Sequence, residues 1–209
     1  MQPDELNRFL AVAEEAADIA HRQFVEGIGA APAMYKGAND FATEVDLQIE
    51  ASLRAHLTES TGIPVLGEEK GGRNSGEALW VVDPIDGTAN FSSGNPNCAV
   101  LISLVVDGQP VVSVTDVPML NMRLTAVKGS CVTLNGTQLP RLDEAAPVSN
   151  QVGVGTVGTD DTSRVPPDSR LKLIKALEYS NMRPRISGSV GLDPVSYTHL
   201  RAHETEADL

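Results

Sequence analysis

The sequence contains few aromatic residues, few cysteines and no long apolar run, and each shortage excludes a class of protein. Phe, Trp and Tyr make up 4% of the 209 residues against 41% for all hydrophobic residues, so the core must be built mainly from aliphatic side chains. The two cysteines, Cys98 and Cys131, show no CxxC or Cys/His spacing. That excludes a zinc-finger pattern and a disulfide framework, and it predicts buried free thiols. No apolar run approaches the roughly 20 residues that a membrane-spanning helix needs.

Basic residues are also scarce. The chain has 16 Lys and Arg against 28 Asp and Glu, which gives a formal net charge of −12. An acidic surface repels phosphate backbones and anionic lipids, so we expect no nucleic-acid or membrane partner, whereas divalent cations are natural ligands. The N-terminal residues lack the basic and apolar regions of a signal peptide, which predicts a cytoplasmic protein.

The apolar pattern predicts helices first, then a run of strands. Stripes with a helical period cover Leu6 to Phe24 and Leu47 to Leu57, and Thr61-Gly62 closes the second helix. Gly27 to Ala38 is rich in Gly and Pro and predicts a loop. Short β runs follow, then one more strand and one more helix, at 63–66, 79–82, 99–106, 111–117, 123–127, 152–157 and 169–179. This order favours an α+β protein with an antiparallel sheet.

The segment Asp83-Pro84-Ile85-Asp86-Gly87 is the most informative in the chain. It follows a buried β run, and the fixed φ of Pro84 together with the freedom of Gly87 allows a sharp bend. Such a bend could bring the carboxylates of Asp83 and Asp86 and the carbonyl of Ile85 to one point, which is an oxygen donor set that suits Mg²⁺. The alternative is an ordinary Asp/Pro/Gly turn. The spacing excludes an EF-hand.

Four further residues strengthen the metal-site hypothesis. Thr88 is predicted as the N-cap of a short helix, whose free N–H groups would seat an anion beside the cation. Glu68 and Glu69 follow a short strand, where a solvated charged turn is the alternative. Asp46 lies at the start of the second helix, where a capping Asp needs no functional role.

In combination, these motifs resemble the inositol monophosphatase family of Mg²⁺-dependent phosphatases. The resemblance extends over roughly residues 5–193. It rests on Lys36 with Asp40-x-x-Thr43-x-x-Asp46, on Gly67-Glu68-Glu69, on the segment from Trp80 to Phe91, and on Gly188-Ser189. It implies a layered αβαβα sandwich.

The resemblance also implies a role for each matching residue. Glu68, Asp83 and the Ile85 carbonyl would bind one Mg²⁺, Asp83 and Asp86 a second, and Glu68 would touch a third and weaker ion. Asp46 and Thr88 match the pair that orients the attacking water, beside Glu68. Gly87 and Thr88 would bind the phosphate, and Gly188, Ser189 and Val190 would line the alcohol side, with Glu68 and Asp86 also bordering the substrate.

The resemblance stops near Asp193. Family members continue with an apolar helix and a Trp-Asp pair that completes the second metal site, whereas no Trp follows Trp80 here. We therefore expect an incomplete domain over residues 1–193 and a non-native tail over 194–209. His199 and His203 have the i, i+4 spacing of a zinc half-site, but an exposed tail explains them without a metal.

The expected function is hydrolysis of inositol 1-phosphate. Histidinol-phosphate or 3′(2′),5′-bisphosphate nucleotide hydrolysis is the sibling alternative, because these enzymes share the metal core. An inactive fragment that binds metal or a protein partner is the alternative of another class. The resemblance also implies a homodimer.

Overall fold

The computed structural model describes residues 1–37, 40–72, 76–140, 151–154, 166–180 and 182–192. The predicted tail over 194–209, with His199 and His203, lies outside the described residues. So do residues 158–165, between the strand predicted at 152–157 and the helix predicted at 169–179. None of the described helices is long and apolar enough to cross a membrane.

Two long helices begin the chain. Helix α1 spans Pro3–Gly27 and α2 spans Glu44–Thr61. The buried face of α1 repeats with the helical period and is largely alanine, which lets the helices approach closely. A capping box starts α2: the Thr43 hydroxyl accepts hydrogen bonds from the backbone N–H groups of Val45 and Asp46, while the Asp46 carboxylate accepts one from the Thr43 N–H. Gly62 ends α2 with a φ of 71°.

A seven-stranded sheet forms the centre of the molecule, in the order β3-β4-β5-β6-β7-β8-β9. The strands are Val65–Gly67, Ala78–Asp86, Ala99–Val106, Gln109–Val117, Met122–Val127, Thr133–Leu134 and Thr137–Gln138, with a 3₁₀ turn at Pro118–Leu120. Asp107 and Gly108 form the β5–β6 turn with φ of 51° and 75°. The predicted antiparallel pairing is correct except at β3, which pairs with β4 in parallel.

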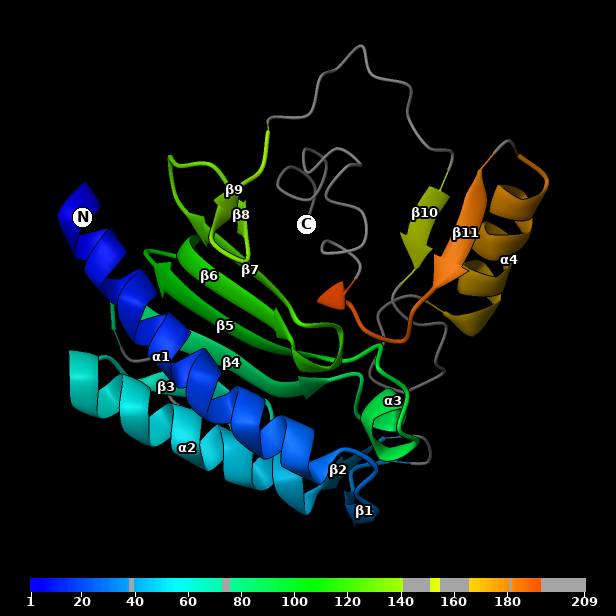
Figure 1. The fold of residues 1–209 in the computed structure, drawn as a ribbon. Coiled ribbons are helices and arrows are strands. Elements are labelled where there is room, and N and C mark those ends of the chain that lie inside the picture. The colour runs from blue at the N-terminus through cyan, green and yellow to red at the C-terminus, as the bar shows by residue number, and fades with distance from the viewer. Residues whose placement is uncertain (38–39, 73–75, 141–150, 155–165, 181, 193–209) are drawn as a thin grey trace.

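The main core lies between the two helices and one face of this sheet (Figure 1). Trp80 is fully buried there and meets Phe9 edge-on, with 6.3 Å between ring centroids, and Phe24 meets Phe91 at 4.8 Å. Val100 and Ile102 point into this core. Their neighbours Ala99 and Leu101 belong to a second apolar cluster around Leu192 on the other face.

The remaining elements are short. Strands β1 (Pro32–Tyr35) and β2 (Phe41–Thr43) form a hairpin next to α3 (Thr88–Ser92), while β10 (Gln151–Val154) and β11 (Arg183–Ile186) pair in parallel beside α4 (Pro167–Glu178) (Figure 1). Helices and sheets in layers confirm the predicted α+β sandwich. The predicted loop over Gly27 to Ala38 is wrong in part because β1 lies within it. Cys98 is buried as predicted, but Cys131 is exposed in the β7–β8 connection.

Candidate active site

Strand β4 positions the predicted metal ligands. Its pairing with β5 is regular as far as Asp83, which lies opposite Leu101. The next pair is Asp86 with Ala99, so β4 has one more residue than β5 between these two pairs. Pro84 lies in this irregular stretch, where its missing N–H interrupts the ladder. The Ile85 N–H donates to Asp83 Oδ1 at 3.1 Å. Asp83 and Asp86 are therefore placed by a bulge at the end of the strand, not by a separate turn.

Gly87 follows with a φ of 87° and is the N-cap of α3. A Cβ at this position would lie 3.0 Å from the Gly188 carbonyl oxygen, so glycine suits both the conformation and the space. The predicted N-cap role of Thr88 is wrong, because Thr88 is the first helical residue. Its hydroxyl is hydrogen-bonded to the Ile85 carbonyl oxygen at 3.0 Å and to Asp46 Oδ1 at 3.3 Å.

Asp46 and Thr88 thus meet as the resemblance implied, from helices that are far apart in the sequence. Asp46 is fully buried on α2, and its second carboxylate oxygen accepts from the backbone N–H and the hydroxyl of Thr43. Burial raises the pKa of Asp46, and the hydrogen bonds from Thr43 and Thr88 partly oppose that change. The capping box therefore also aims Asp46 at Thr88.

Glu68 and Glu69 follow β3 and share one cation. The Lys36 ammonium donates to Glu68 Oε1 at 3.1 Å and to Glu69 Oε1 at 2.6 Å. Burial lowers the pKa of Lys36, but the hydrogen bonds to the two glutamates outweigh burial and raise it overall. Glu69 Oε2 is buried and has no hydrogen-bond partner among the described residues.

A pocket of about 210 Å³ brings most of the predicted site residues together. It is lined by Asp40, Phe41, Glu68, Asp83, Ile85, Asp86, Gly87, Thr88, Ala89 and Gly188. Burial, and then the negative charges of Glu68 and Asp86, raise the pKa of Asp83 to about 9. These like charges would be relieved by a cation. Asp40 and Phe41 were not predicted to line the site, although Asp40 belongs to the motif that carries the resemblance.

The segment 188–191 closes one side of the pocket through Asp86. The Ser189 hydroxyl and the backbone N–H of Gly191 donate to Asp86 Oδ2, and the N–H of Val190 donates to Oδ1 at 3.2 Å. Ser189 is fully buried, so its hydroxyl serves Asp86 and not the open pocket. Val190 is 62% exposed and lines an adjoining, mainly apolar cavity of about 720 Å³ together with Glu68 and Asp83.

The donor set fits Mg²⁺ in its chemistry. Four acidic residues and Ile85 line one pocket, and hard oxygen donors such as carboxylates and backbone carbonyls are what this ion prefers. Within the described part of the chain, no three His, Cys, Asp or Glu side chains converge closely enough to form a ready-made metal cluster. The cation that faces Glu68 in this arrangement is the ammonium of Lys36.

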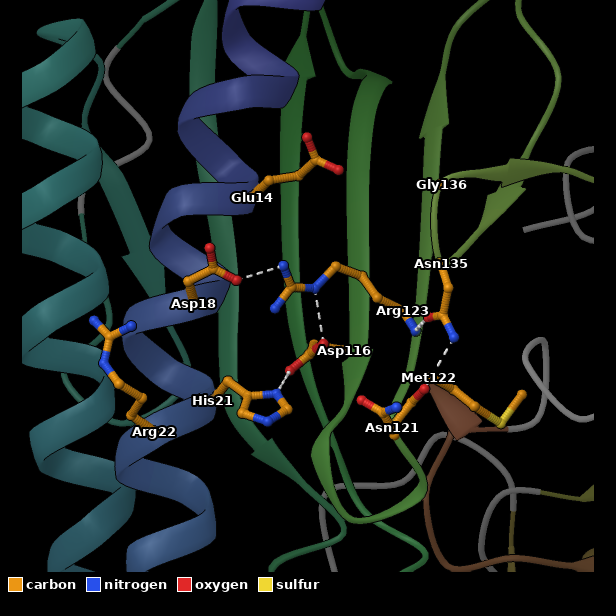
Figure 2. Close-up of a pocket in the computed structure, with 10 residues that line it drawn as sticks. All are labelled: Glu14, Asp18, His21, Arg22, Asp116, Asn121, Met122, Arg123, Asn135 and Gly136. Carbon is orange, nitrogen blue, oxygen red and sulfur yellow. Dashed lines mark hydrogen bonds and ion pairs between the residues drawn. The ribbon is translucent and has the colours of Figure 1, made fainter.

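A second cavity, of about 450 Å³, lies between α1 and the sheet and shares no lining residue with the first. The side chains of His21, Arg123 and Asp116 point toward one another there (Figure 2). Asp116 is 2.8 Å from both His21 Nδ1 and Arg123 Nε, and Arg123 also pairs with Asp18 at 2.6 Å. Because these charges satisfy one another, the cluster ties α1 to β6 and β7 and is not a second reaction centre.

Comparisons with known proteins agree with this geometry. The model of the inositol monophosphatase family matches residues 5–199. The chain is 38% identical over 194 residues to inositol-1-monophosphatase ImpA of Mycolicibacterium smegmatis, covering 92% of this chain and 70% of that protein. It is 42% identical over 179 residues to the probable inositol 1-monophosphatase ImpA of Mycobacterium tuberculosis, covering 85% of this chain and 66% of that protein.

A solved structure agrees as well. The inositol monophosphatase of Thermotoga maritima superposes with a TM-score of 0.76 at 26% identity, covering 92% of this chain and 73% of that one. The match thus spans about two thirds of the length of the ImpA relatives.

Proposed function

Because the chain belongs to the inositol monophosphatase family, a family of phosphomonoester hydrolases, we propose that it is a Mg²⁺-dependent phosphatase acting on inositol 1-phosphate. One observation carries the proposal: Glu68, Asp83, Asp86 and the Ile85 carbonyl border the same pocket as Thr88. Carboxylates for metal ions and a hydroxyl for water are the groups that metal-assisted hydrolysis of a phosphate ester uses.

The proposed metal ligands follow the resemblance to the family, and all of them line this pocket. Glu68, Asp83 and the Ile85 carbonyl would hold one Mg²⁺, Asp83 and Asp86 a second, and Glu68 a third and weaker ion. When bound, these ions neutralise the phosphate dianion, lower the pKa of a bound water and stabilise the leaving alkoxide. The Asp86 carboxylate already accepts three hydrogen bonds from the segment 188–191. These bonds fix its orientation in the pocket, where it would serve as a ligand.

The Asp46–Thr88 pair would orient the attacking water. When Asp46 accepts the hydrogen of the Thr88 hydroxyl, the Thr88 oxygen keeps its lone pairs to accept a hydrogen from water. The water then presents its own lone pair to phosphorus, on the side opposite the ester oxygen. The new P–O bond to the water oxygen forms as the P–O bond to the ester oxygen breaks. The water leaves its OH on phosphorus, and its other hydrogen is, in net, the proton that the released alkoxide takes up.

The other pocket residues would bind substrate. Gly87 and Thr88 would donate backbone N–H groups to the phosphate, next to the bend that the φ of Gly87 makes possible. Gly188 lines the pocket and Val190 the adjoining cavity, so these two residues would border the alcohol, with Glu68 and Asp86 at the edge of the substrate. Ser189 is buried behind Asp86, so the alcohol-lining role that the resemblance implied for it is replaced by holding Asp86.

A parallel assay of substrates tests the proposal. Inorganic phosphate released from inositol 1-phosphate, histidinol phosphate and adenosine 3′,5′-bisphosphate is measured with Mg²⁺ on the 209-residue chain. The highest kcat/KM is expected for inositol 1-phosphate, and preference for another ester would correct the substrate but not the reaction.

No release from any ester by a folded chain that binds Mg²⁺ would contradict the hydrolase proposal. That result favours an inactive fragment that binds metal or a protein partner. Restored turnover after grafting the C-terminal part of a family member would support this second candidate.

A further inference from the structure

A buried carboxylate lies inside the loop that carries Glu68. Glu50 is on α2, has no exposed surface and reaches into the loop that follows β3. Its Oε2 accepts the backbone N–H of Glu69 at 2.7 Å, and its Oε1 accepts that of Lys70 at 3.1 Å. Successive N–H groups that point at one carboxylate form an anion-binding concavity, here filled by a side chain of the protein itself.

Arg54, one turn further along α2, secures both ends of the same loop. Its guanidinium donates to Glu50 Oε1 at 2.9 Å, to the Gly71 carbonyl at 2.7 Å, and to the Val65 carbonyl. The loop also closes on itself, because the Gly67 N–H donates to the Gly71 carbonyl at 3.0 Å. The ion pair therefore bonds to the main chain before, within and after the two glutamates.

Gly67 leaves room for the Glu50 carboxylate because it has no side chain. A Cβ at Gly67 would lie 2.2 Å from Glu50 Cδ and 2.3 Å from Oε2, so any larger residue would push the Glu50 carboxylate away from its N–H partners. A buried ion pair is a poor means of stabilising a fold, since apolar side chains of similar size usually do as well. The specific bonds of Glu50 and Arg54 to the loop backbone thus suggest a role in holding its geometry.

We infer that Glu50 and Arg54 are positioning residues that hold the loop 67–71 so that Glu68 faces Asp83 across the pocket. The inference rests on the proposed function, in which Glu68 is a Mg²⁺ ligand. The Glu68 side chain is 43% exposed, so a loop without these bonds would let Glu68 turn toward solvent. Groups that fix a ligand in this way typically change metal affinity or activity by about 10–100-fold when they are altered.

The test compares Glu50→Gln with Asp116→Asn in the full 209-residue chain. Both variants change a buried carboxylate with an arginine partner into its amide, but Asp116 lines the other cavity (Figure 2). Mg²⁺ affinity is measured by titration calorimetry without substrate, and the half-saturating Mg²⁺ concentration by phosphate release from inositol 1-phosphate. Glu50→Gln is expected to weaken Mg²⁺ binding, so that the Kd for Mg²⁺ and the half-saturating Mg²⁺ concentration both rise by about 10-fold or more, with kcat recovered at high Mg²⁺. Asp116→Asn should leave both unchanged.

A folded Glu50→Gln variant with unchanged Mg²⁺ affinity, or an equal shift in Asp116→Asn, would overturn the inference. If Glu50→Gln does not fold, Arg54→Met replaces it, because the Arg54 side chain is 31% exposed and its loss leaves Glu50 in place. A folded Arg54→Met variant with unchanged affinity overturns the inference equally.

Mg²⁺ binding and phosphate release together distinguish failure of the proposed function from failure of the inference about Glu50. A parent chain that binds Mg²⁺ but releases no phosphate refutes the proposed function, while calorimetry still decides the role of Glu50. A parent chain that binds no Mg²⁺ refutes both.

Discussion

Asp83→Asn should stabilise the metal-free protein while abolishing its response to Mg²⁺. Asp83 is held near Glu68 and Asp86, and its pKa rises from 3.8 to about 9. A carboxyl whose pKa is higher in the folded state binds a proton more tightly there than in the unfolded chain. It therefore lowers the stability of the fold increasingly as the pH rises from about 4 toward 9. Asn has no proton to lose and avoids this penalty.

The magnitude follows from the pH interval. At pH 7 about 3 pH units separate the solution from the unfolded pKa, which at 1.36 kcal/mol per unit sets an upper limit of about 4 kcal/mol. Relaxation of the loop that carries Glu68 reduces this, so we expect a gain of about 2 kcal/mol, or about 4–8 °C in Tm for a domain of this size. The gain should vanish near pH 4.

Thermal unfolding followed by circular dichroism, in EDTA and in excess Mg²⁺, measures both effects. Mg²⁺ at about 100 times its Kd should stabilise the parent chain by about 2.7 kcal/mol and leave Asp83→Asn unchanged. An Asp83→Asn variant that is no more stable than the parent in EDTA at pH 7, or that Mg²⁺ still stabilises, would refute the reasoning.

Three further predictions concern the groups around this centre. Thr43→Ala removes the hydroxyl half of the α2 capping box, keeps the backbone N–H bond to Asp46, and should lower the free energy of unfolding by about 1–2 kcal/mol in urea titrations; an unchanged value would contradict the role of the cap. Ser189→Ala removes a donor to buried Asp86 and should cost about 1.5–3 kcal/mol in the same titration, whereas a stability equal to the parent's would mean that the bond contributes nothing. Thr88→Ala should lower kcat about 10²–10⁴-fold because the attacking water loses the hydroxyl that orients it, while Thr88→Ser keeps that hydroxyl and most of the rate; equal losses in the two variants would argue against water orientation.

The long elements could be predicted from the sequence because their apolar periodicity is local. The strand predicted at 99–106 spans the same residues in the structure, and the stripe from Leu6 to Phe24 lies within α1. Strand β1 was not predicted, because all four of its residues are exposed and carry no apolar pattern. The extension of β4 through Pro84 was missed for another reason: proline in a strand normally indicates a turn, and only pairing with β5 shows the bulge.

In the candidate site, too, residues that are close in sequence could be predicted, whereas residues that meet only in the folded chain could not. Asp83, Ile85 and Asp86 are close in sequence, so their shared placement could be predicted from one short segment. Glu50 could not, because its partners are the backbone N–H groups of residues 69 and 70, which pair with it only in the folded chain. Its one sequence signal is the i, i+4 spacing to Arg54 next to an apolar stripe.

The most direct test of the account is phosphate release from inositol 1-phosphate by the 209-residue chain, measured with Mg²⁺ and again after EDTA, beside Asp83→Asn. The account predicts release that depends on Mg²⁺ in the parent chain, stops in EDTA and returns when Mg²⁺ is restored, with no Mg²⁺-dependent release by Asp83→Asn. Release that continues in EDTA, or that Asp83→Asn retains at the parent rate, would contradict it.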